Sequence, residues 1–276
     1  MKFKNGTIFS FFTSGFPSHV RGKAIDVGYY CNDEFVSPLN GIILSIEKFN
    51  VGRPNRFSLT NYDFLILAKT GNTLVKILHV EPYFEKGEEF KVGDVLGKTI
   101  SSPYTGGDFS HAHIEGLRFS FPKVTKREER AIGKVTALNE NYVDVTLLTF
   151  AEAGGWRGLG CCGGLLNGSL PYAGYGGIIG VELSKGVSLM GREYHVHGRR
   201  RNLTVFEKER GLIRDWEYGP AFKVMKNEPI DGFPLLESVL SYHDRPIVRL
   251  FGRFSLKEGE EVDVWSLIRD SLERKV

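Results

Sequence analysis

Two short segments far apart in the chain carry residue types that bind a metal ion. The first, SHVRGKAIDVG at residues 18–28, supplies His19 and Asp26, and the second, SHAHIEG at 110–116, supplies His111 and His113. A mononuclear catalytic zinc takes three nitrogen or oxygen ligands from the protein and keeps one position open for water. His19, Asp26 and His113 satisfy that count for one zinc ion (Zn2+).

The spacing of these residues places a requirement on the backbone between them. His111 and His113 lie two apart in an alternating run, which puts both side chains on one face of a strand. His19 and Asp26 lie seven apart and would face opposite sides of a straight strand. We therefore expect the chain to turn or bulge between them, which Gly22 permits.

These segments resemble the metal-site motifs of one group of zinc peptidases. His19-x-x-Gly22-x-Ala24-x-Asp26 is similar to the H-x-x-G-x-A-x-D signature of D-alanyl-D-alanine peptidases and hedgehog signalling domains. Motifs of lysostaphin-like metallopeptidases are matched in the same order by VSPLNGII at 36–43, LHVEPYFEKGEEFKVGDVLG at 78–97 and HAHIE at 111–115. The resemblance covers roughly residues 14–121.

The resemblance implies a function for each candidate residue. His19, Asp26 and His113 would be the zinc ligands. His111 would act as general base or stabilise the developing oxyanion, and His79 would be a second catalytic histidine. The implied reaction is hydrolysis of a peptide or amide bond. The chain differs from lysostaphin-like enzymes two residues before His79, where it has isoleucine and they commonly have tyrosine.

The rest of the chain predicts a mainly β protein with two domains. The sequence has 276 residues, more than one hydrophobic core usually serves. We expect an N-terminal lysostaphin-like antiparallel β domain at 1–125 and a second β-rich α+β domain at 131–276. The charged segment 123–130 after a proline marks the boundary, although it could also be a solvated helix or loop inside one larger domain.

Several local elements are predicted within these domains. Strand pairs are expected around Thr70-Gly71-Asn72 and Asn139-Glu140-Asn141, and one alternating strand is expected over 111–121. Turn glycines are expected at 87, 93 and 97, and helices at 234–243 and from Val262 to the end. We interpret the glycine-dense segment 154–180 as a long shaped loop or as strands with closely approaching backbones.

Two further motifs in the second half have ordinary structural explanations. Gly158-x-Gly160-x-x-Gly163 fits the dinucleotide fingerprint, but the sequence after it is broken by glycine and proline where the fingerprint requires a helix. His195 and His197 repeat the spacing of a metal motif without further ligands nearby, so a strand with two surface histidines is expected.

The composition of the chain bears on its partners and its cellular location. A net charge of +3 is too small to indicate a nucleic acid or an anionic membrane as partner, and no apolar stretch reaches the length of about 18 residues that a membrane helix needs. We therefore expect no membrane partner and do not expect nucleic acid as a partner. The cysteines are Cys31 and the adjacent pair Cys161 and Cys162, an odd number without disulfide spacing. We therefore expect a reducing, cytoplasmic location without a recognisable signal peptide.

The leading hypothesis is a zinc-dependent metallopeptidase-like hydrolase with a peptide or amide substrate. One alternative is a non-catalytic module in which the same β domain binds a metal or a partner. Another is an RNA-associated protein that acts through residues 131–276, where Arg199, Arg200 and Arg201 form a short basic run.

Overall fold

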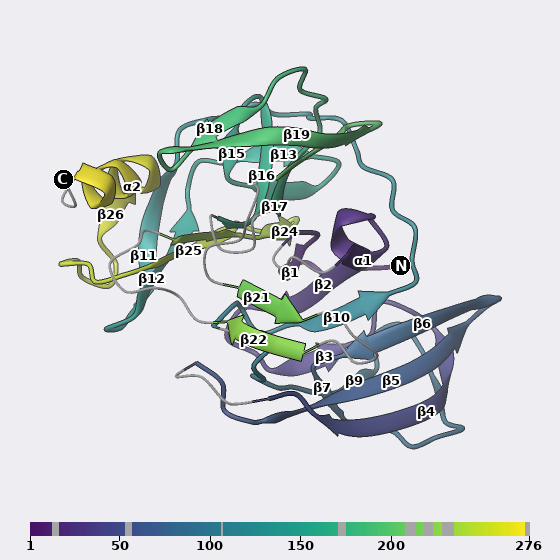
Figure 1. Cartoon of the computed structure of the whole chain (residues 1–276). Helices are drawn as coiled ribbons and strands as arrows, with labels where there is room; N and C mark the ends of the chain where they lie inside the picture. Colours follow the sequence, from purple (N-terminus) through teal and green to yellow (C-terminus); the bar gives the residue numbers. More distant parts are fainter. Residues whose placement is uncertain are drawn as a thin grey trace. The chain divides into compact units, whose positions relative to one another are not determined.

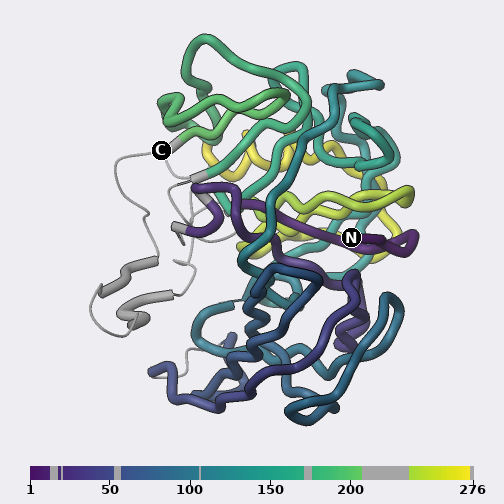
Figure 2. The backbone as a smooth tube through the Cα atoms, turned by 90° about the vertical axis from the view of Figure 1, so that its right-hand side faces the viewer, coloured from purple at the N-terminus to yellow at the C-terminus, as the bar shows by residue number. Residues whose placement is uncertain are grey.

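The computed structural model describes residues 1–12, 17–52, 57–105, 107–170, 175–207, 214–217, 223–227 and 235–273. The described chain is mainly β, with antiparallel sheets, as the sequence predicts. It divides into two compact units, each made of separate stretches of sequence (Figures 1 and 2). Unit 1 comprises residues 1–9, 16–119 and 213–228, and unit 2 comprises 10–15, 120–212 and 229–276.

Unit 1 is built on one large sheet and a smaller one. The large sheet has the order β1, β2, β10, β6, β5, β4, β8. Figure 1 shows β6, β5 and β4 side by side. Their bounds are Thr7–Ser10, Ala24–Tyr29, Ala112–Glu115, Thr73–Leu78, Tyr62–Thr70, Gly41–Asn50 and Glu89–Phe90. The smaller sheet joins β3 (Glu34–Val36), β9 (Val95–Thr99) and β7 (Val80–Pro82). Unit 1 also contains the one-turn helix α1 (Pro17–Val20) and the strand pair β21 (Arg214–Glu217) and β22 (Lys223–Asn227).

The turns of unit 1 follow the predictions in most places. The β5–β6 hairpin pairs Thr70 with Thr73 across the predicted turn, and Gly87 and Gly93 have the positive φ that such turns require. Gly97, however, is not a turn residue. It lies inside β9, where an added Cβ would stand 2.2 Å from the carbonyl oxygen of Glu81, so the strand needs glycine for close approach.

The strand predicted over 111–121 is shorter than expected. β10 ends at Glu115 because Gly116 takes a φ of +97°, which breaks the extended conformation. Residues 117–121 form no strand.

Unit 2 contains a sheet with the order β18, β19, β20, β17, β16, β23, β25, β12, β11, β26, and β15 pairs with β16. In chain order the unit has β11 (Ile132–Leu138), β12 (Tyr142–Leu147), β13 (Ala151–Ala153), β14 (Trp156–Gly158), β15 (Gly160–Cys161), β16 (Gly164–Leu170), β17 (Tyr175–Ile179), β18 (Val187–Leu189), β19 (Arg192–Arg200), β20 (Leu203–Glu207), β23 (Leu235–Ser238), β24 (Leu240–Tyr242), β25 (Ile247–Phe251), β26 (Glu261–Asp263) and α2 (Val264–Glu273). The predicted hairpin around Glu140 joins β11 and β12.

The prediction of a helix at 234–243 is wrong. The described part of this segment forms strands β23 and β24, and residue 234 lies outside the described residues. β23 pairs with β16 on one side and with β25 on the other, so tertiary pairing outweighs the local helical pattern. The C-terminal helix is confirmed as α2, which follows β26 (yellow in Figure 1) and is capped by Asp263, whose Oδ1 accepts from the backbone N–H of Trp265 at 2.9 Å.

The described part of the glycine-dense segment consists of short strands joined by tight turns. β14 to β17 occupy most of it, and an added Cβ at Gly177 would stand 2.3 Å from the ring of Phe12. The reading as strands with close approach is therefore correct, and the dinucleotide motif leads into a strand, β16. Throughout the described ranges, no helix has the length and apolar character needed to cross a membrane.

Candidate metal centre

A turn at Gly22 brings His19 and Asp26 to the same place. His19 lies in α1, and the chain reverses when the N–H of Gly22 donates to the carbonyl of His19 at 2.8 Å and that of Lys23 donates to Ser18 at 2.8 Å. Gly22 has a φ of +62°, a conformation that costs other residues about 1–2 kcal/mol. The required turn is therefore present, as a single helical turn that leads into β2.

The second segment joins the first through strand pairing. β10 pairs antiparallel with β2, and His113 is the direct partner of Asp26. Close approach of these strands depends on Gly28, where an added Cβ would stand 2.1 Å from the carbonyl oxygen of Ser110. His111 precedes β10 by one residue, and its Nε2 lies 3.8 Å from Oδ1 of Asp26, so both histidines face the same carboxylate.

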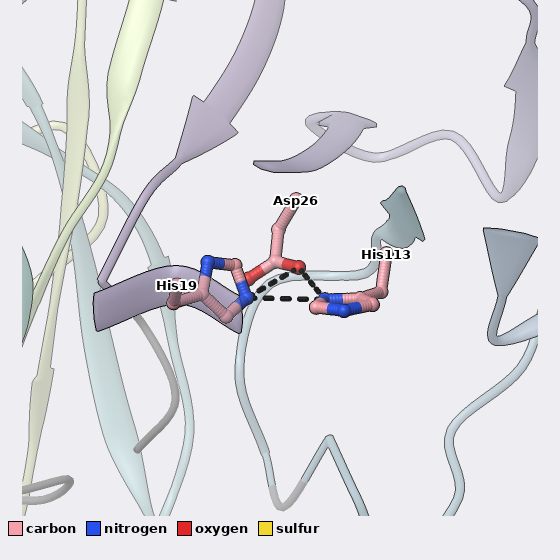
Figure 3. A group of neighbouring side chains, drawn as sticks. All are labelled: His19, Asp26 and His113. Carbon is pink, nitrogen blue, oxygen red and sulfur yellow. Dashed lines mark hydrogen bonds and ion pairs between the residues drawn. The ribbon is translucent and has the colours of Figure 1, made fainter. Parts of the chain in front are cut away.

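Three potential ligand atoms converge at this point (Figure 3). Oδ1 of Asp26 lies 2.8 Å from Nδ1 of His113 and 3.2 Å from Nε2 of His19, and the two nitrogens are 3.0 Å apart. Ligand atoms about 2.1 Å from a tetrahedral zinc lie about 3.4 Å from one another. The donor set of two imidazoles and one carboxylate, all buried, thus fits a zinc ion after shifts of a few tenths of an ångström.

The electrostatics of the site favour a positive charge between these side chains. Burial alone would raise the pKa of Asp26, but the neighbouring His19 and His111 and the hydrogen bonds from His113 and His19 hold it well below its usual value. Burial would lower the pKa of His113, but its hydrogen bonds to Asp26 and Glu115 raise it to about 9. In the metal-free protein a proton therefore supplies the charge that a cation would bring.

Glu115 holds the far side of the His113 ring. Its Oε1 lies 3.2 Å from Nε2 of His113, and Lys76 lies 3.6 Å from its Oε2. The hydrogen bond to His113 is the main reason why the pKa of Glu115 falls to about 2. Carboxylates placed in this way orient metal-binding histidines and raise their basicity.

His111 is arranged as a neutral base. Its Nδ1 donates to the backbone carbonyl of Phe109 at 2.7 Å, which leaves the lone pair on Nε2, the nitrogen nearest Asp26. Burial, together with the nearby His79 and His113, lowers the pKa of His111 to about 4 despite the attraction of Asp26. The side chain therefore stays neutral at neutral pH.

His79 is held beside His111 by a residue that the sequence reading missed. Oδ2 of Asp63 lies 2.5 Å from Nδ1 of His79, Oδ1 accepts from the His79 backbone N–H at 2.9 Å, and Ser102 donates to Oδ2 at 2.9 Å. Asp63 is fully buried, and its pKa is lowered because His79 and these hydrogen bonds outweigh burial. The His79 and His111 rings lie 5.4 Å apart at 90°.

Tyr104 completes the group of polar residues around His79. Its ring centroid lies 5.8 Å from that of His79. Burial and the charge of Asp63 raise the pKa of Tyr104 to about 12, so its hydroxyl keeps its proton and can donate a hydrogen bond. The sequence reading did not single out this residue.

The candidates in unit 2 have ordinary structural roles. His195 and His197 lie on β19 with exposed side chains, as expected for a strand with surface histidines. Arg199 of the short basic run donates to the backbone carbonyls of Leu183 at 2.6 Å and Ser184 at 2.7 Å. The guanidinium group of Arg199 is therefore bound to the loop at 183–184, and less of the basic run 199–201 is available to contact RNA.

Residues 2–138 match a protein family described as a domain of unknown function (DUF8155), N-terminal domain. The match contains every residue of the candidate metal centre. No curated protein and no solved structure matches the chain.

Proposed function

We propose that this protein is a zinc-dependent hydrolase that cleaves a peptide or amide bond. The observation that carries the proposal is the joint placement of three convergent ligand atoms and two further buried histidines in unit 1. A zinc site that only stabilises the fold needs four closed ligands and has no use for an oriented neutral imidazole next to them. The three free cysteines are compatible with a cytoplasmic location.

The zinc ion and the neighbouring side chains would have different roles in the reaction. Zinc held by His19, Asp26 and His113 supplies Lewis acidity, which polarises a carbonyl and acidifies water. His111 accepts the proton of the attacking water, since its Nε2 lone pair faces the site. His79 is the second catalytic histidine, and Asp63 orients its ring by accepting a hydrogen bond from Nδ1.

Metal analysis of the purified full chain tests the ligand set. We expect one zinc ion per chain in the wild type and none in His113→Ala. His195→Ala is the matched control, because it removes an exposed histidine from β19 and should leave zinc content unchanged. Full zinc occupancy in His113→Ala would show that the ion binds elsewhere.

His111→Ala separates a hydrolase from a non-catalytic module. For a hydrolase, zinc affinity should change less than about threefold, whereas cleavage of a defined peptide mixture, followed by mass spectrometry, should fall about 10²- to 10⁴-fold. A large loss of zinc affinity would identify His111 as a fourth ligand. The site would then be closed, and the alternative of a metal-binding or partner-binding module would be preferred.

A further inference from the structure

Two adjacent cysteines lie at a tight turn in unit 2. Cys161 ends β15 and pairs with Gly164 of β16, so Cys162 and Gly163 form a two-residue hairpin loop. Both loop residues have positive φ, +56° and +82°, which is the conformation of a type I′ turn. Asn, Asp or Gly usually takes the first position of that turn, so a cysteine there is unusual.

The turn brings the two sulfur atoms together. Sγ of Cys161 lies 2.9 Å from Sγ of Cys162, and both thiols are reduced in the structure. Cys161 is buried in the hydrophobic core of unit 2, and Cys162 is partly exposed at its edge. One thiol is therefore accessible to a reagent, and the other is within reach of any product formed on the first.

The pKa values of the two thiols also favour reaction at the more accessible residue, Cys162. The hydrogen bond from Cys161 lowers the pKa of Cys162 against the opposing effects of burial and Glu129, whereas the same bond and burial raise the pKa of Cys161. The thiolate thus forms first on the accessible residue.

We infer that Cys161 and Cys162 form a redox-active dithiol that low-molecular-weight disulfides oxidise reversibly to a vicinal disulfide. The Cys162 thiolate attacks one sulfur of the small disulfide, forms a mixed disulfide and releases one small thiolate. Cys161 then attacks Sγ of Cys162, and the second small thiolate leaves. The two cysteines lose two electrons and two protons, and the small disulfide gains both as two thiols.

The product is expected to be labile. Adjacent Cα atoms lie about 3.8 Å apart across a trans peptide, below the range of about 4.4–6.8 Å found for ordinary disulfides. Strained disulfides are readily reduced, which suits a reversible modification and not a structural cross-link.

Reaction of the reduced full chain with glutathione redox buffers tests the inference. After acid quenching and alkylation, peptide mapping by mass spectrometry should find the peptide that contains Cys161 and Cys162 without alkyl groups and two hydrogens lighter than its reduced form. Treatment with a reductant before alkylation should make both cysteines alkylatable again. Cys31, exposed and remote in sequence, serves as the internal control and should form only a mixed disulfide. A pair that stays fully alkylatable where Cys31 has reacted, or that links two chains, would overturn the inference.

Three variants examine the order of the steps. Cys161→Ser should stop the reaction at a stable mixed disulfide on Cys162, whereas Cys162→Ser should abolish fast reaction at the pair. Glu129→Gln keeps an acceptor for the N–H of Gly163, which Glu129 binds at 2.8 Å, but removes a negative charge. It should speed oxidation at least about twofold. A stable mixed disulfide in the wild type, without closure, would contradict the role of Cys161.

Discussion

The hydrogen bonds of Asp63 make Asp63→Asn the most informative single change at the candidate site. Its carboxylate accepts four of them, from the backbone N–H groups of Phe64 and His79, from Nδ1 of His79 and from the hydroxyl of Ser102. Asparagine can keep its oxygen on the two backbone donors. Its amide NH₂ then faces Nδ1 of His79, which must accept instead of donate, so the proton of the neutral ring moves to Nε2.

The size of the effect follows from these bonds. Two hydrogen bonds to a charged acceptor, each worth about 1.5–3 kcal/mol, become neutral bonds worth about 1 kcal/mol or are lost. We expect unfolding to become easier by about 2 kcal/mol, a fall in Tm of about 4–8 °C. Loss of correctly placed acid–base function at His79 should reduce hydrolysis about 10²- to 10⁴-fold. Zinc affinity should stay within about threefold, because these bonds involve none of the three ligands.

Three measurements on the same sample check this expectation. Long-range ¹H–¹⁵N spectra of the imidazoles report the His79 tautomer, chelator competition reports zinc affinity, and peptide cleavage reports activity. Ser102→Ala is the matched control, since it removes one bond to the same Oδ2 atom but leaves His79 donating to it. It should cost about 1 kcal/mol and less than about tenfold in activity.

Two outcomes for Asp63→Asn would contradict a role of Asp63 through His79. If Asp63→Asn binds zinc normally and shifts the His79 proton to Nε2 but hydrolyses peptides at the wild-type rate, then His79 takes no part in the reaction. If zinc binding is lost as well, Asp63 supports the fold of the whole site and does not act through His79 alone.

Glu115→Gln should weaken zinc binding about 10- to 100-fold in chelator competition, and unchanged affinity would contradict its role in orienting His113. Zinc binding near pH 7.5 should release about one proton, because the pKa of His113 is about 9 in the metal-free protein. Calorimetry in two buffers of different ionisation enthalpy counts that proton. The same raised pKa stabilises the metal-free fold fully below about pH 6.5, the unfolded value, and this contribution is lost as pH rises through about 9, so the Tm of the metal-free protein should fall over that window. Gly22→Ala should cost about 1–2 kcal/mol at its φ of +62° and weaken zinc binding by moving His19, whereas Gly71→Ala, at a φ of +57° in open space, should affect only stability.

The grouping of His19, Asp26 and His113 could be predicted because each step has a local cause. Alternation along 111–115 puts both histidines on one face, and Gly22 allows the reversal that the spacing of seven requires. Residue type and short-range geometry therefore identify these positions. Whether water or a fourth side chain completes the site depends on the distance of His111 Nε2 from Asp26, which only the folded chain defines.

The error at 234–243 has a different cause. The local sequence PLLESVLSYH suits a helix, but Glu237 lies opposite Arg249 on β25, and Arg249 also binds Asp144 on β12 through a bond of 2.7 Å. Three charged residues on neighbouring strands thus share a buried row, and burial of that row requires the strand conformation. On its other side Glu237 pairs with Ser169 of β16, which lies 237 − 169 = 68 residues earlier, and partners at such separations leave no trace in a local pattern.

Asp63, by contrast, could be located from the sequence only as a near neighbour of His79. The turn at Gly71 was predicted, and an antiparallel hairpin that pairs Thr70 with Thr73 continues in register to Leu65 opposite Leu78. One further step in register sets Phe64 opposite His79 and leaves Asp63 one residue beyond, on the other face of a regular strand. His79 has a φ of +66° directly after the end of β6, so the regular alternation does not hold at this residue. A carboxylate beside a histidine in an apolar hairpin points to an oriented imidazole, because an unpaired buried carboxylate is costly. The register of the predicted turn therefore brings Asp63 close to His79, whereas the contact between their side chains depends on the left-handed conformation of His79, which the local sequence does not indicate.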